Sequence, residues 1–597
     1  MKNNRRHKLL FGRFAVVSLL IILQIFITLS FWIYIDNQQF LFNSRIIAIE
    51  IEVIILLVII NRYEPAAYKL PWVCVILILP VAGVVLYLIF ASPKTAYRIK
   101  KRFAKARKEY EHYLPENDSS GIAAADKDGA NISNYIFNKI KTPVYYGAEC
   151  EYYGSGEKFF HSLKTELKEA EKFILMEYFI IGEGKMWNEI HKILLEKVKS
   201  GVKVFLLYDD VGSIGKIPNH FDAKIRKEGI VCYKFNPFVP VVSGFLNNRD
   251  HRKITVVDGK VAFTGGVNVA DEYINEEHPF GVWKDAAVKI TGKAVNAFSM
   301  IFIELFNLYA ANPLEPSEFI TDAFSDKIGQ GEKYSADAEE KVEVSADENL
   351  KKKPEKLFGS IDEYLENAEK ALARGEKDFE RLDASEELRS PWLSETPAVD
   401  AETAAEKSEK TIAVQPFCDG PRPFYEDTVA QNIYTNIIYS AKEYLYITTP
   451  YIIVDYALSE AIKLAAERGV DVRIFTPHIP DKKSIFVMTR SNYEQFLKSG
   501  VKIYEYGDGF MHAKTLVSDD RIAVVGTVNL DYRSFVHHYE CGAVFYGNKN
   551  SALICDIKND FLSTAAACGI LQSAESAKLN FFQKALKVII GLFAPLL

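Results

Sequence analysis

Long apolar runs near the start of the chain give way to short strands and amphipathic segments further on. Phe14–Ile35 is 22 residues without a charge, and Leu70–Phe90 is 21 residues without a charge. Each run is long enough to cross a hydrocarbon core of about 30 Å as a helix. A third run, Ile46–Ile60, is shorter and holds two glutamates, which are costly at a bilayer centre. The pattern predicts a membrane anchor over residues 1–92 with two or three transmembrane helices.

Basic residues flank this anchor on both sides. Lysines and arginines open the segment 93–145, and the positive-inside rule places that side in the cytoplasm, where the segment also attracts anionic lipids. The N-terminus is basic too, so both ends obey the rule only if the number of spans is even. The number of spans therefore stays open. We expect a multi-pass protein of the cell membrane, a basic linker over 93–145, and catalytic halves in the cytoplasm.

Beyond this linker, two stretches repeat the same order of predicted elements. Residues 158–213 and 430–486 each show a helical pattern, an apolar strand, a helix, and a second strand that begins after Gly-Val. Short apolar strands separated by helices are typical of α/β units with buried sheets. Similarity at so long an offset indicates a duplicated domain. We expect a first half over 146–313 and a second half over 413–597.

Charge distinguishes the segment between the halves. Residues 311–410 carry 27 Asp+Glu and 14 Lys+Arg, a net charge of −13, so the rest of the chain carries −6 + 13 = +7. A mildly basic body suits anionic surfaces or phosphates. We expect 314–412 to be an acidic, largely disordered insert that acts as a solvated linker, with a docking site for a protein partner as the alternative. The 7 cysteines form no C-x-x-C pattern, which excludes a zinc ribbon, and their odd number excludes a disulfide scaffold.

The motif H-x-K-x4-D occurs once in each half. It comprises His251, Lys253 and Asp258 in the first half and His512, Lys514 and Asp519 in the second. Glycines and then an asparagine follow each copy, Asn268 and Asn529 respectively. Residues two apart on a strand share a face, so the histidine and lysine of each copy should point the same way. The Asp258-Gly259 pair predicts a hairpin turn, after which the chain returns Asn268 to the same end of the sheet.

Each half thus offers an imidazole, an ammonium group and an amide. Lysine is a compact cation suited to phosphate oxygens, and histidine serves as nucleophile, acid or base. One half supplies a single motif histidine, whereas two facing halves supply both a nucleophile and a general acid. That is the minimum for a two-step displacement at phosphorus. The sequence shows no dedicated carboxylate cluster, so we expect neither a metal nor another cofactor.

The motifs and their surroundings resemble the phospholipase D superfamily, and within it the bacterial cardiolipin synthases. The resemblance rests on NNRDHRKITVVDGKVAFTGGVNVADEY with the following Trp283-Lys-Asp285, and on GVKIYEYGDGFMHAKTLVSDDRIAVVGTVNLDYRSF with Glu540. It covers roughly 50–310 and 412–597. It implies two phospholipase D-type α/β sandwich halves that face each other, preceded by N-terminal transmembrane helices. The insert 314–412 and the first span have no counterpart in the family's compact form, which leaves regulation and topology open.

For activity, the resemblance implies a phosphatidyltransferase that joins two phosphatidylglycerols through a phosphohistidine and releases glycerol. His251 is the expected attacking group and His512 the acid and base, although the reverse assignment fits equally well. The remaining implied roles are oxyanion binding by Lys253, Lys514, Asn268 and Asn529, orientation by Asp258 and Asp519, and support by Ser534. The implied partners are phosphatidylglycerol and anionic membrane lipids, without nucleic acid.

Several alternatives share the same motif chemistry. A phospholipase D hydrolase would give the phosphatidyl group to water, and a related transferase would use another alcohol or phosphatidylethanolamine as donor. The apolar anchor disfavours a nuclease, and two intact motifs disfavour a non-enzymatic membrane scaffold. His278, His537 and His538 lie outside the repeated pattern, so we expect them to be structural or at the rim of the site.

Overall fold

In the computed structural model, the described part of the chain comprises residues 40–62, 66–90, 103–104, 106–108, 113–237, 248–321, 412–422, 424–425, 427–573, 575 and 580–593. The expected first membrane run, Phe14–Ile35, and most of the expected acidic insert lie outside these residues. Residues 314–321, at the start of that insert, are described and pack on the first half. There the ring centroid of Phe319 lies 4.9 Å from that of Phe173.

A seven-stranded mixed sheet forms the centre of the first half. Its strands lie in the order β2 (Cys150–Tyr153), β10 (Ala287–Thr291), β8 (Val261–Gly265), β7 (Lys253–Val257), β3 (Phe173–Tyr178), β4 (Lys203–Asp209) and β5 (Val231–Phe235). The last three strands run parallel, and the other neighbours are antiparallel. Parallel neighbours need a crossover connection, which α9 (Lys185–Lys199) and α10 (Phe221–Lys227) provide.

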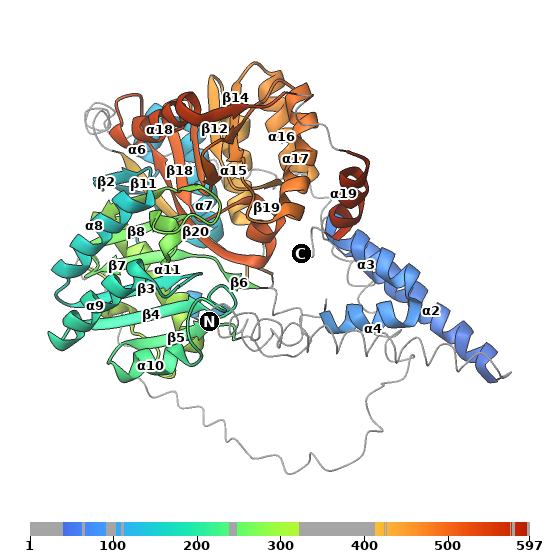
Figure 1. The fold of residues 1–597 in the computed structure, drawn as a ribbon, viewed down its shortest axis with the longest axis horizontal. Helices are drawn as coiled ribbons and strands as arrows, with labels where there is room; N and C mark the ends of the chain where they lie inside the picture. The colour runs from blue at the N-terminus through green and yellow to red at the C-terminus, as the bar shows by residue number, and fades with distance from the viewer. Residues whose placement is uncertain are drawn as a thin grey trace, which may run out of the picture. The chain divides into compact units, whose positions relative to one another are not determined.

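Helices cover both faces of this sheet. On β3, Met176 and Tyr178 belong to the apolar cluster under α8 (Gly156–Glu169) and α9. Leu175, on the opposite face, belongs to the cluster that contains α11 (Val295–Tyr309). Successive strand side chains point to opposite faces, so an apolar strand such as β3 has to be covered on both sides. Figure 1 shows α8 and α9 along one face of the sheet.

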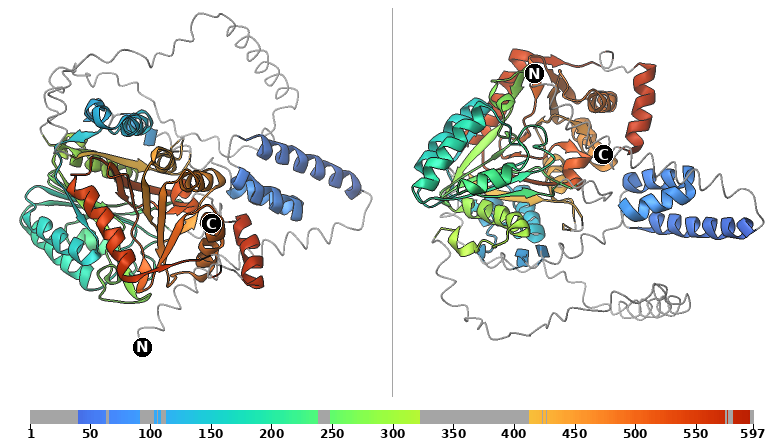
Figure 2. Two further views of the ribbon diagram at one scale, coloured as in Figure 1. Left: turned by 90° about the horizontal axis from the view of Figure 1, so that it is seen from above. Right: turned by 60° about the horizontal axis from the view of Figure 1, so that its bottom comes forward.

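The second half repeats this plan in its own sheet. The strand order is β1 (Tyr145–Tyr146), β11 (Ala413–Asp419), β20 (His538–Tyr546), β18 (Ile522–Gly526), β17 (Thr515–Ser518), β12 (Tyr444–Thr448), β14 (Asp471–Pro477), β15 (Lys502–Tyr506) and β21 (Gly569–Leu571). The accompanying helices are α15 (Val429–Ser440), α16 (Tyr456–Glu467), α17 (Lys483–Lys498) and α18 (Ala552–Cys568). The run from β20 to β15 matches the run from β10 to β5 strand for strand. Figure 2 shows the first half, in cyan to green, beside the second half, in orange to red. The expectation of two similar α/β halves is therefore confirmed.

Part of the expected linker 93–145 is built into the second half. Helices α6 (Ser120–Ala125) and α7 (Lys127–Ile140) precede β1, which pairs antiparallel with β11. The side-chain amide of Gln415 on β11 donates to the carbonyls of Ser133 and Thr142, at 3.1 and 2.7 Å. Residues that precede the first half thus complete the edge of the second sheet.

The described part of the apolar N-terminal region forms three helices. They are α2 (Phe40–Asn61), α3 (Ala66–Ile78) and α4 (Pro80–Phe90). The expectation of one continuous span over 70–90 is corrected, because the helix breaks at Leu79, where the following Pro80 disfavours helical backbone. Gly83 permits close packing at this break, since a Cβ there would lie 2.6 Å from the Cα of Ile76. Among the described ranges, no helix has both the length and the apolar character needed to cross a membrane.

Candidate active site

The two motifs meet at one buried centre. Lys253 Nζ donates to the carbonyl of His251 at 2.5 Å, and Lys514 Nζ donates to the carbonyl of His512. Each lysine therefore lies beside the histidine two residues before it. The exposed fractions of the histidines are only 6% and 8%, and those of the lysines are 2% and 1%. The charges of Lys514 and His512 both act on His251, as expected for groups from two halves in one site.

Each histidine is bonded to a carboxylate of the opposite half. His251 Nδ1 lies 3.0 Å from both oxygens of Glu540, and His512 Nδ1 lies 2.6 Å from Asp285 Oδ2. Both carboxylates are fully buried. A carboxylate acceptor holds the proton on Nδ1 and leaves the lone pair on Nε2 available for chemistry. Each motif histidine thus depends on the opposite half for its carboxylate.

Short strands exchanged between the halves create these pairs. β6 (Arg249–Asp250) runs parallel to the start of β20, and β16 (Gly509–Met511) runs parallel to β9 (Val282–Lys284). The backbone N–H of His251 donates to the carbonyl of Tyr539 at 2.9 Å. The backbone N–H of His512 donates to the carbonyl of Lys284 at 2.7 Å. The chain before each histidine is thus held against the chain before the opposite carboxylate.

Burial and cationic neighbours lower the pKa of both histidines. Burial, followed by the charges of Lys253 and Lys514, holds the pKa of His251 well below its usual range. Burial and Lys514 lower the pKa of His512 to about 4, although Asp285 acts in the opposite direction. A neutral imidazole retains the lone pair that a nucleophile or general base needs.

The two lysines are desolvated as well. Burial lowers the pKa of Lys253 to about 8, against the raising effect of Glu540. Burial lowers the pKa of Lys514 to about 7, against the raising effect of Asp285. An anion between the lysines would raise both values, because opposite charge favours the protonated form. The centre is therefore suited to a phosphate group.

The asparagines and Ser534 make contacts within their own halves. Asn268 accepts from the backbone N–H of Ile180 at 3.0 Å and donates to the hydroxyl of Tyr273 at 2.7 Å. In the second half, the backbone N–H of Asn529 donates to the Ser534 hydroxyl at 3.1 Å. The side-chain oxygen of Asn529 is buried and has no hydrogen-bond partner among the described residues. Asn268 is thus engaged within its own half, and Ser534 positions the Asn529 backbone.

Asp258 and Asp519 stand at the opposite end of the motif strands from the histidines. Asp258 accepts from the backbone N–H groups of Glu171, Lys172 and Phe173 at 2.7, 2.7 and 2.8 Å. Asp519 accepts from those of Lys442, Glu443 and Tyr444, each at 2.9 Å. Asp258 and Gly259, with φ of 53° and 66°, also form the expected hairpin turn between β7 and β8. Each aspartate fastens the motif strand to the start of its neighbour.

Replacing Asp258 by alanine should lower stability more than it alters chemistry. The substitution removes three accepted hydrogen bonds and places a Cβ without a polar partner at positive φ, so we expect a loss of about 2 kcal/mol or more. Asp258→Asn retains one acceptor oxygen and tolerates this φ, so it should cost less. The midpoint of denaturant unfolding of the full-length protein measures both. An unchanged midpoint with lost activity would contradict this structural role.

Sequence reasoning did not select the two carboxylates as site residues. Asp285 and Glu540 occupy equivalent positions in the two halves. Asp285 lies two residues before the partner of Gly265 at the end of β8. Glu540 lies two residues before the partner of Gly526 at the end of β18. That signal depends on strand register and on the exchanged pairing, which no local motif encodes. The glycine after Gly265 is a local sign of the position of Asp285, because a Cβ at Gly266 would lie 2.0 Å from Asp285 Oδ1.

His538 also lies closer to the chemistry than its position outside the motif suggests. Its ring centroid is 5.2 Å from that of His251, and its Nδ1 is 3.4 Å from Glu540 Oε1. One ligand atom from each of these three residues lies within 4.8 Å of the others, a set that could hold a metal ion. The cationic neighbours Lys253, Lys514 and Arg533 all lower the pKa of His251, after burial. We therefore interpret the centre as an anion site.

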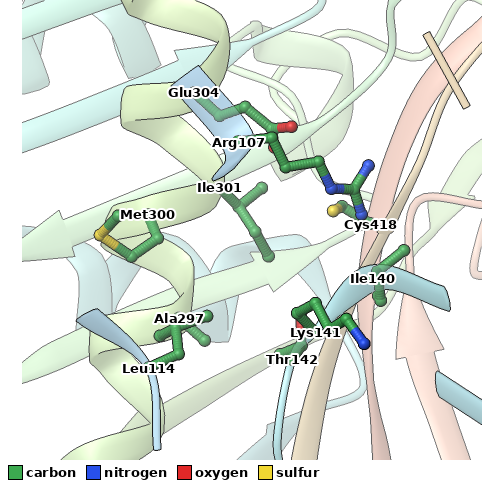
Figure 3. A pocket seen from close by; sticks show the side chains of 10 residues that line it. All are labelled: Arg107, Leu114, Ile140, Lys141, Thr142, Ala297, Met300, Ile301, Glu304 and Cys418. Atoms are coloured by element: carbon green, nitrogen blue, oxygen red, sulfur yellow. The ribbon is translucent and has the colours of Figure 1, made fainter. Parts of the chain in front are cut away.

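A cavity of about 30 Å³ lies apart from the motifs (Figure 3). Its lining includes Glu304 and Met300 of α11, Arg107, Lys141 and Cys418. None of the site residues described above contributes to it. A volume of this size accommodates about one water molecule, so the cavity is too small for a lipid headgroup.

Two family models match this chain. One, described as "Cardiolipin synthase, PLD-like domain", matches residues 163–302 and 434–563, one stretch in each half. The other, described as "Phospholipase_D-nuclease N-terminal", matches residues 53–91. The first model covers both copies of the strand–helix repeat and both histidine motifs.

Relatives match over most of their length and most of this chain. A Streptococcus mutans serotype c protein, named only as uncharacterized, is 32% identical over 545 residues and covers 91% of this chain and 99% of its own. A protein named cardiolipin synthase from Geobacillus kaustophilus is 27% identical over 556 residues, covering 92% of this chain and 93% of its own. A Staphylococcus aureus protein of the same name is 29% identical over 546 residues, covering 88% and 90%.

A solved structure supports the same fold. Phosphatidylserine synthase of Haemophilus influenzae aligns with a TM-score of 0.50 over 79% of this chain and 97% of its own, at 15% identity. At that identity the likeness bears on the arrangement of the two halves alone.

Proposed function

Because the chain belongs to the family of phospholipase D-like cardiolipin synthases, we propose that it transfers a phosphatidyl group between two phosphatidylglycerol molecules, giving cardiolipin and glycerol. One observation carries this proposal: the two motif histidines share a centre with two lysines, and each is bonded to a buried carboxylate of the opposite half. A transferase that works by double displacement needs one group to attack phosphorus and another to move protons.

In the first step, Nε2 of His251 attacks the phosphorus of one phosphatidylglycerol. The bond from phosphorus to the glycerol headgroup breaks, and His512, protonated on both ring nitrogens when the anionic lipid phosphate is bound, gives its Nε2 proton to the departing oxygen. His512 suits this acid role because its 2.6 Å bond to Asp285 stabilises the imidazolium form. His251, held neutral, suits the attack.

In the second step, His512 accepts the proton of a hydroxyl on the second phosphatidylglycerol. That oxygen attacks the phosphohistidine, the P–N bond breaks, and His251 leaves as neutral imidazole. Protons and charges balance over the two steps, because the proton given to glycerol is recovered from the second lipid. No group outside this chain is needed for either transfer.

The lysines stabilise the charge that builds up at phosphorus in both steps. Lys253 and Lys514 are compact cations in a buried centre, where electrostatic interactions are stronger than in water. The side-chain oxygen of Asn529 has no hydrogen-bond partner among the described residues, and rotation of that amide would present a donor to a phosphate oxygen. Asp258 and Asp519 contribute by fastening the strands that carry the lysines.

The test of this function is product analysis in vesicles. Purified full-length protein with labelled phosphatidylglycerol should give cardiolipin and glycerol in a ratio of one to one, and EDTA should leave the rate unchanged. Phosphatidic acid without cardiolipin would identify a hydrolase instead. Activity that EDTA abolishes and a divalent cation restores would contradict the metal-free mechanism.

We also propose that the N-terminal region anchors the protein in the membrane, with the catalytic halves in the cytoplasm. Residues 14–35 form a run of 22 residues without a charge, and α2–α4 expose large apolar side chains such as Ile54, at 59%, and Leu77, at 60%. At the other end of the chain, α19 (Phe581–Phe593) exposes Phe581 at 79%. Carbonate extraction of cell membranes tests this proposal, and release of the full-length protein into the soluble fraction would refute it.

A further inference from the structure

Beside His251, the pairing of β6 with the start of β20 places four side chains on one face. Arg249 of β6 is the register partner of His538 on β20. His251 and Glu540 lie two residues further along their strands, and residues two apart share a face. The 3.0 Å contact between His251 and Glu540 agrees with this arrangement. Arg249 and His538 therefore form a row next to the catalytic row, about 6.6 Å along the strands.

Two nitrogen atoms of the Arg249 guanidinium in this second row have no hydrogen-bond partner among the residues that the structure describes. Arg249 is 2% exposed, and its Nη1 donates to Asp209 at 3.3 Å and to the carbonyl of Asn236 at 3.2 Å. Its Nε and Nη2 are buried without a partner among the described residues, whereas Nδ1 of His538 lies 3.4 Å from Glu540 Oε1. Buried donors of a charged group are costly when they remain unpaired. Such donors indicate a place for an anionic ligand.

Arg533 adds a second guanidinium group to this row. Its Nε donates to Nε2 of His538 at 3.2 Å, which leaves the proton of the neutral imidazole on Nδ1, as a donor. Burial lowers the pKa of Arg533, Asp531 opposes that effect, and the charge of Arg249 lowers the pKa further. The effect of the Arg249 charge on Arg533 is expected for two guanidinium groups that lie near each other. The side chain of Arg533 is half-buried.

The equivalent row in the other half has a different chemistry. Phe510 lies two residues before His512, and its register partner Trp283 lies two residues before Asp285. The two rings are 4.9 Å apart. The internal duplication therefore has a basic row beside His251 and an aromatic row beside His512. If the site bound one symmetric ligand, the rows beside the two histidines would not need to differ in chemistry.

We propose that Arg249, His538 and Arg533 form a second phosphate-binding subsite, which holds the phosphodiester of the acceptor phosphatidylglycerol during transfer. This inference rests on the proposed function. Cardiolipin formation brings two phosphates into the site, joined by a flexible three-carbon bridge, whereas hydrolysis or return to free glycerol brings only one. The central lysines bind the phosphate under attack, and the neighbouring basic row binds the second.

The subsite gives the enzyme a means of choosing a lipid acceptor over water. Two guanidinium groups and an imidazole N–H supply charge-assisted hydrogen bonds that water and glycerol cannot use. The acceptor hydroxyl is then positioned by a group that takes no part in the bond changes. Loss of the subsite should therefore slow transfer to lipid and spare the formation of the phosphohistidine.

Arg533→Gln and His538→Gln test this directly in the full-length protein. Phosphatidylglycerol vesicles with labelled free glycerol report two reactions at once. Cardiolipin requires the second phosphate, whereas labelled phosphatidylglycerol arises when the enzyme-bound phosphatidyl group returns to glycerol. We expect cardiolipin formation to fall about tenfold or more in each variant and glycerol exchange to fall far less, so that the ratio of cardiolipin to labelled phosphatidylglycerol drops.

Arg468→Gln provides a matched control. Arg468 is an exposed arginine of the same half whose guanidinium donates to the carbonyls of Ile438, Tyr439 and Ala441. Its replacement should change neither rate. A parallel fall of cardiolipin formation and glycerol exchange in the Arg533 and His538 variants, or a fall in neither, would overturn the subsite. Wild-type protein that yields only phosphatidic acid would instead overturn the proposed function.

Discussion

Replacing His251 or His512 by alanine should abolish cardiolipin formation in phosphatidylglycerol vesicles. Each variant lacks either the attacking nitrogen or the proton donor, and groups that act as one unit lose most of their effect when a single member is removed. We expect a fall of about three orders of magnitude or more for each, with the double variant little worse than either. The measurement is the initial rate of labelled cardiolipin and glycerol release.

His478→Ala is the matched control for this experiment. His478 Nδ1 also lies near a buried carboxylate, 2.8 Å from Glu505, but it belongs to neither motif. Its loss should leave the rate within about twofold of the wild type, as a single-residue change away from the site does. Equal loss in all three variants would show a folding defect. Near-normal turnover in either motif variant would refute a site shared by both histidines.

The same pair of variants bears on which histidine attacks. The variant that keeps the attacking histidine can still form some phosphatidyl-enzyme, because a headgroup that leaves easily needs no general acid. A phosphatidylglycerol analogue with a nitrophenyl leaving group should therefore label His512→Ala and not His251→Ala. The label should be acid-labile, as a P–N bond is. Label in His251→Ala alone would reverse the assignment.

The sequence predicted the duplicated fold because the information is local. Apolar strands, amphipathic helices and a Gly-Val turn recur in both halves, and each repeat encodes its own sheet. The hairpin at Asp258-Gly259 follows for the same reason, since two successive positive φ values favour those residue types. Histidine and lysine two positions apart could likewise be placed together from strand geometry alone.

The carboxylates that bond the histidines could not be predicted in this way. Asp285 pairs with His512 and Glu540 with His251 only because strands β9 and β20 pair with segments of the opposite half. A motif scan assigns each acid to its own half or to none. The break at Leu79 was missed for a related reason. The apolar run over 70–90 predicted one long helix, whereas Pro80 disfavours helical backbone at the residue before it and so divides the run into two helices.

Removing the charge of Asp285 should have the second-largest effect on turnover. Burial raises the pKa of Asp285, but His512 and Lys514 outweigh burial and hold the pKa below its usual range, so the group is an anion near neutral pH. Asp285→Asn keeps the shape but no longer stabilises the imidazolium of His512. We expect kcat to fall about 10²- to 10⁴-fold. The reciprocal variant, Glu540→Gln, should act on His251 in the same way.

The pH profile separates this electrostatic role from a loss of folding. Burial lowers the pKa of Lys514 to about 7, so the lysine is protonated below that pH. The charge of Asp285 opposes burial and raises the pKa of Lys514. In the wild type, kcat/KM should therefore decline as pH rises through about 7 to 8, where Lys514 and Lys253 lose their protons. Without the Asp285 charge the pKa of Lys514 falls further, so the decline should move to lower pH. Asp471→Asn, which alters a carboxylate bonded to Arg473 and Lys502 at the edge of the second sheet, should leave the profile unchanged. A large fall in rate with an unshifted profile would show that Asp285 acts on packing and leaves the charge of the centre unaffected.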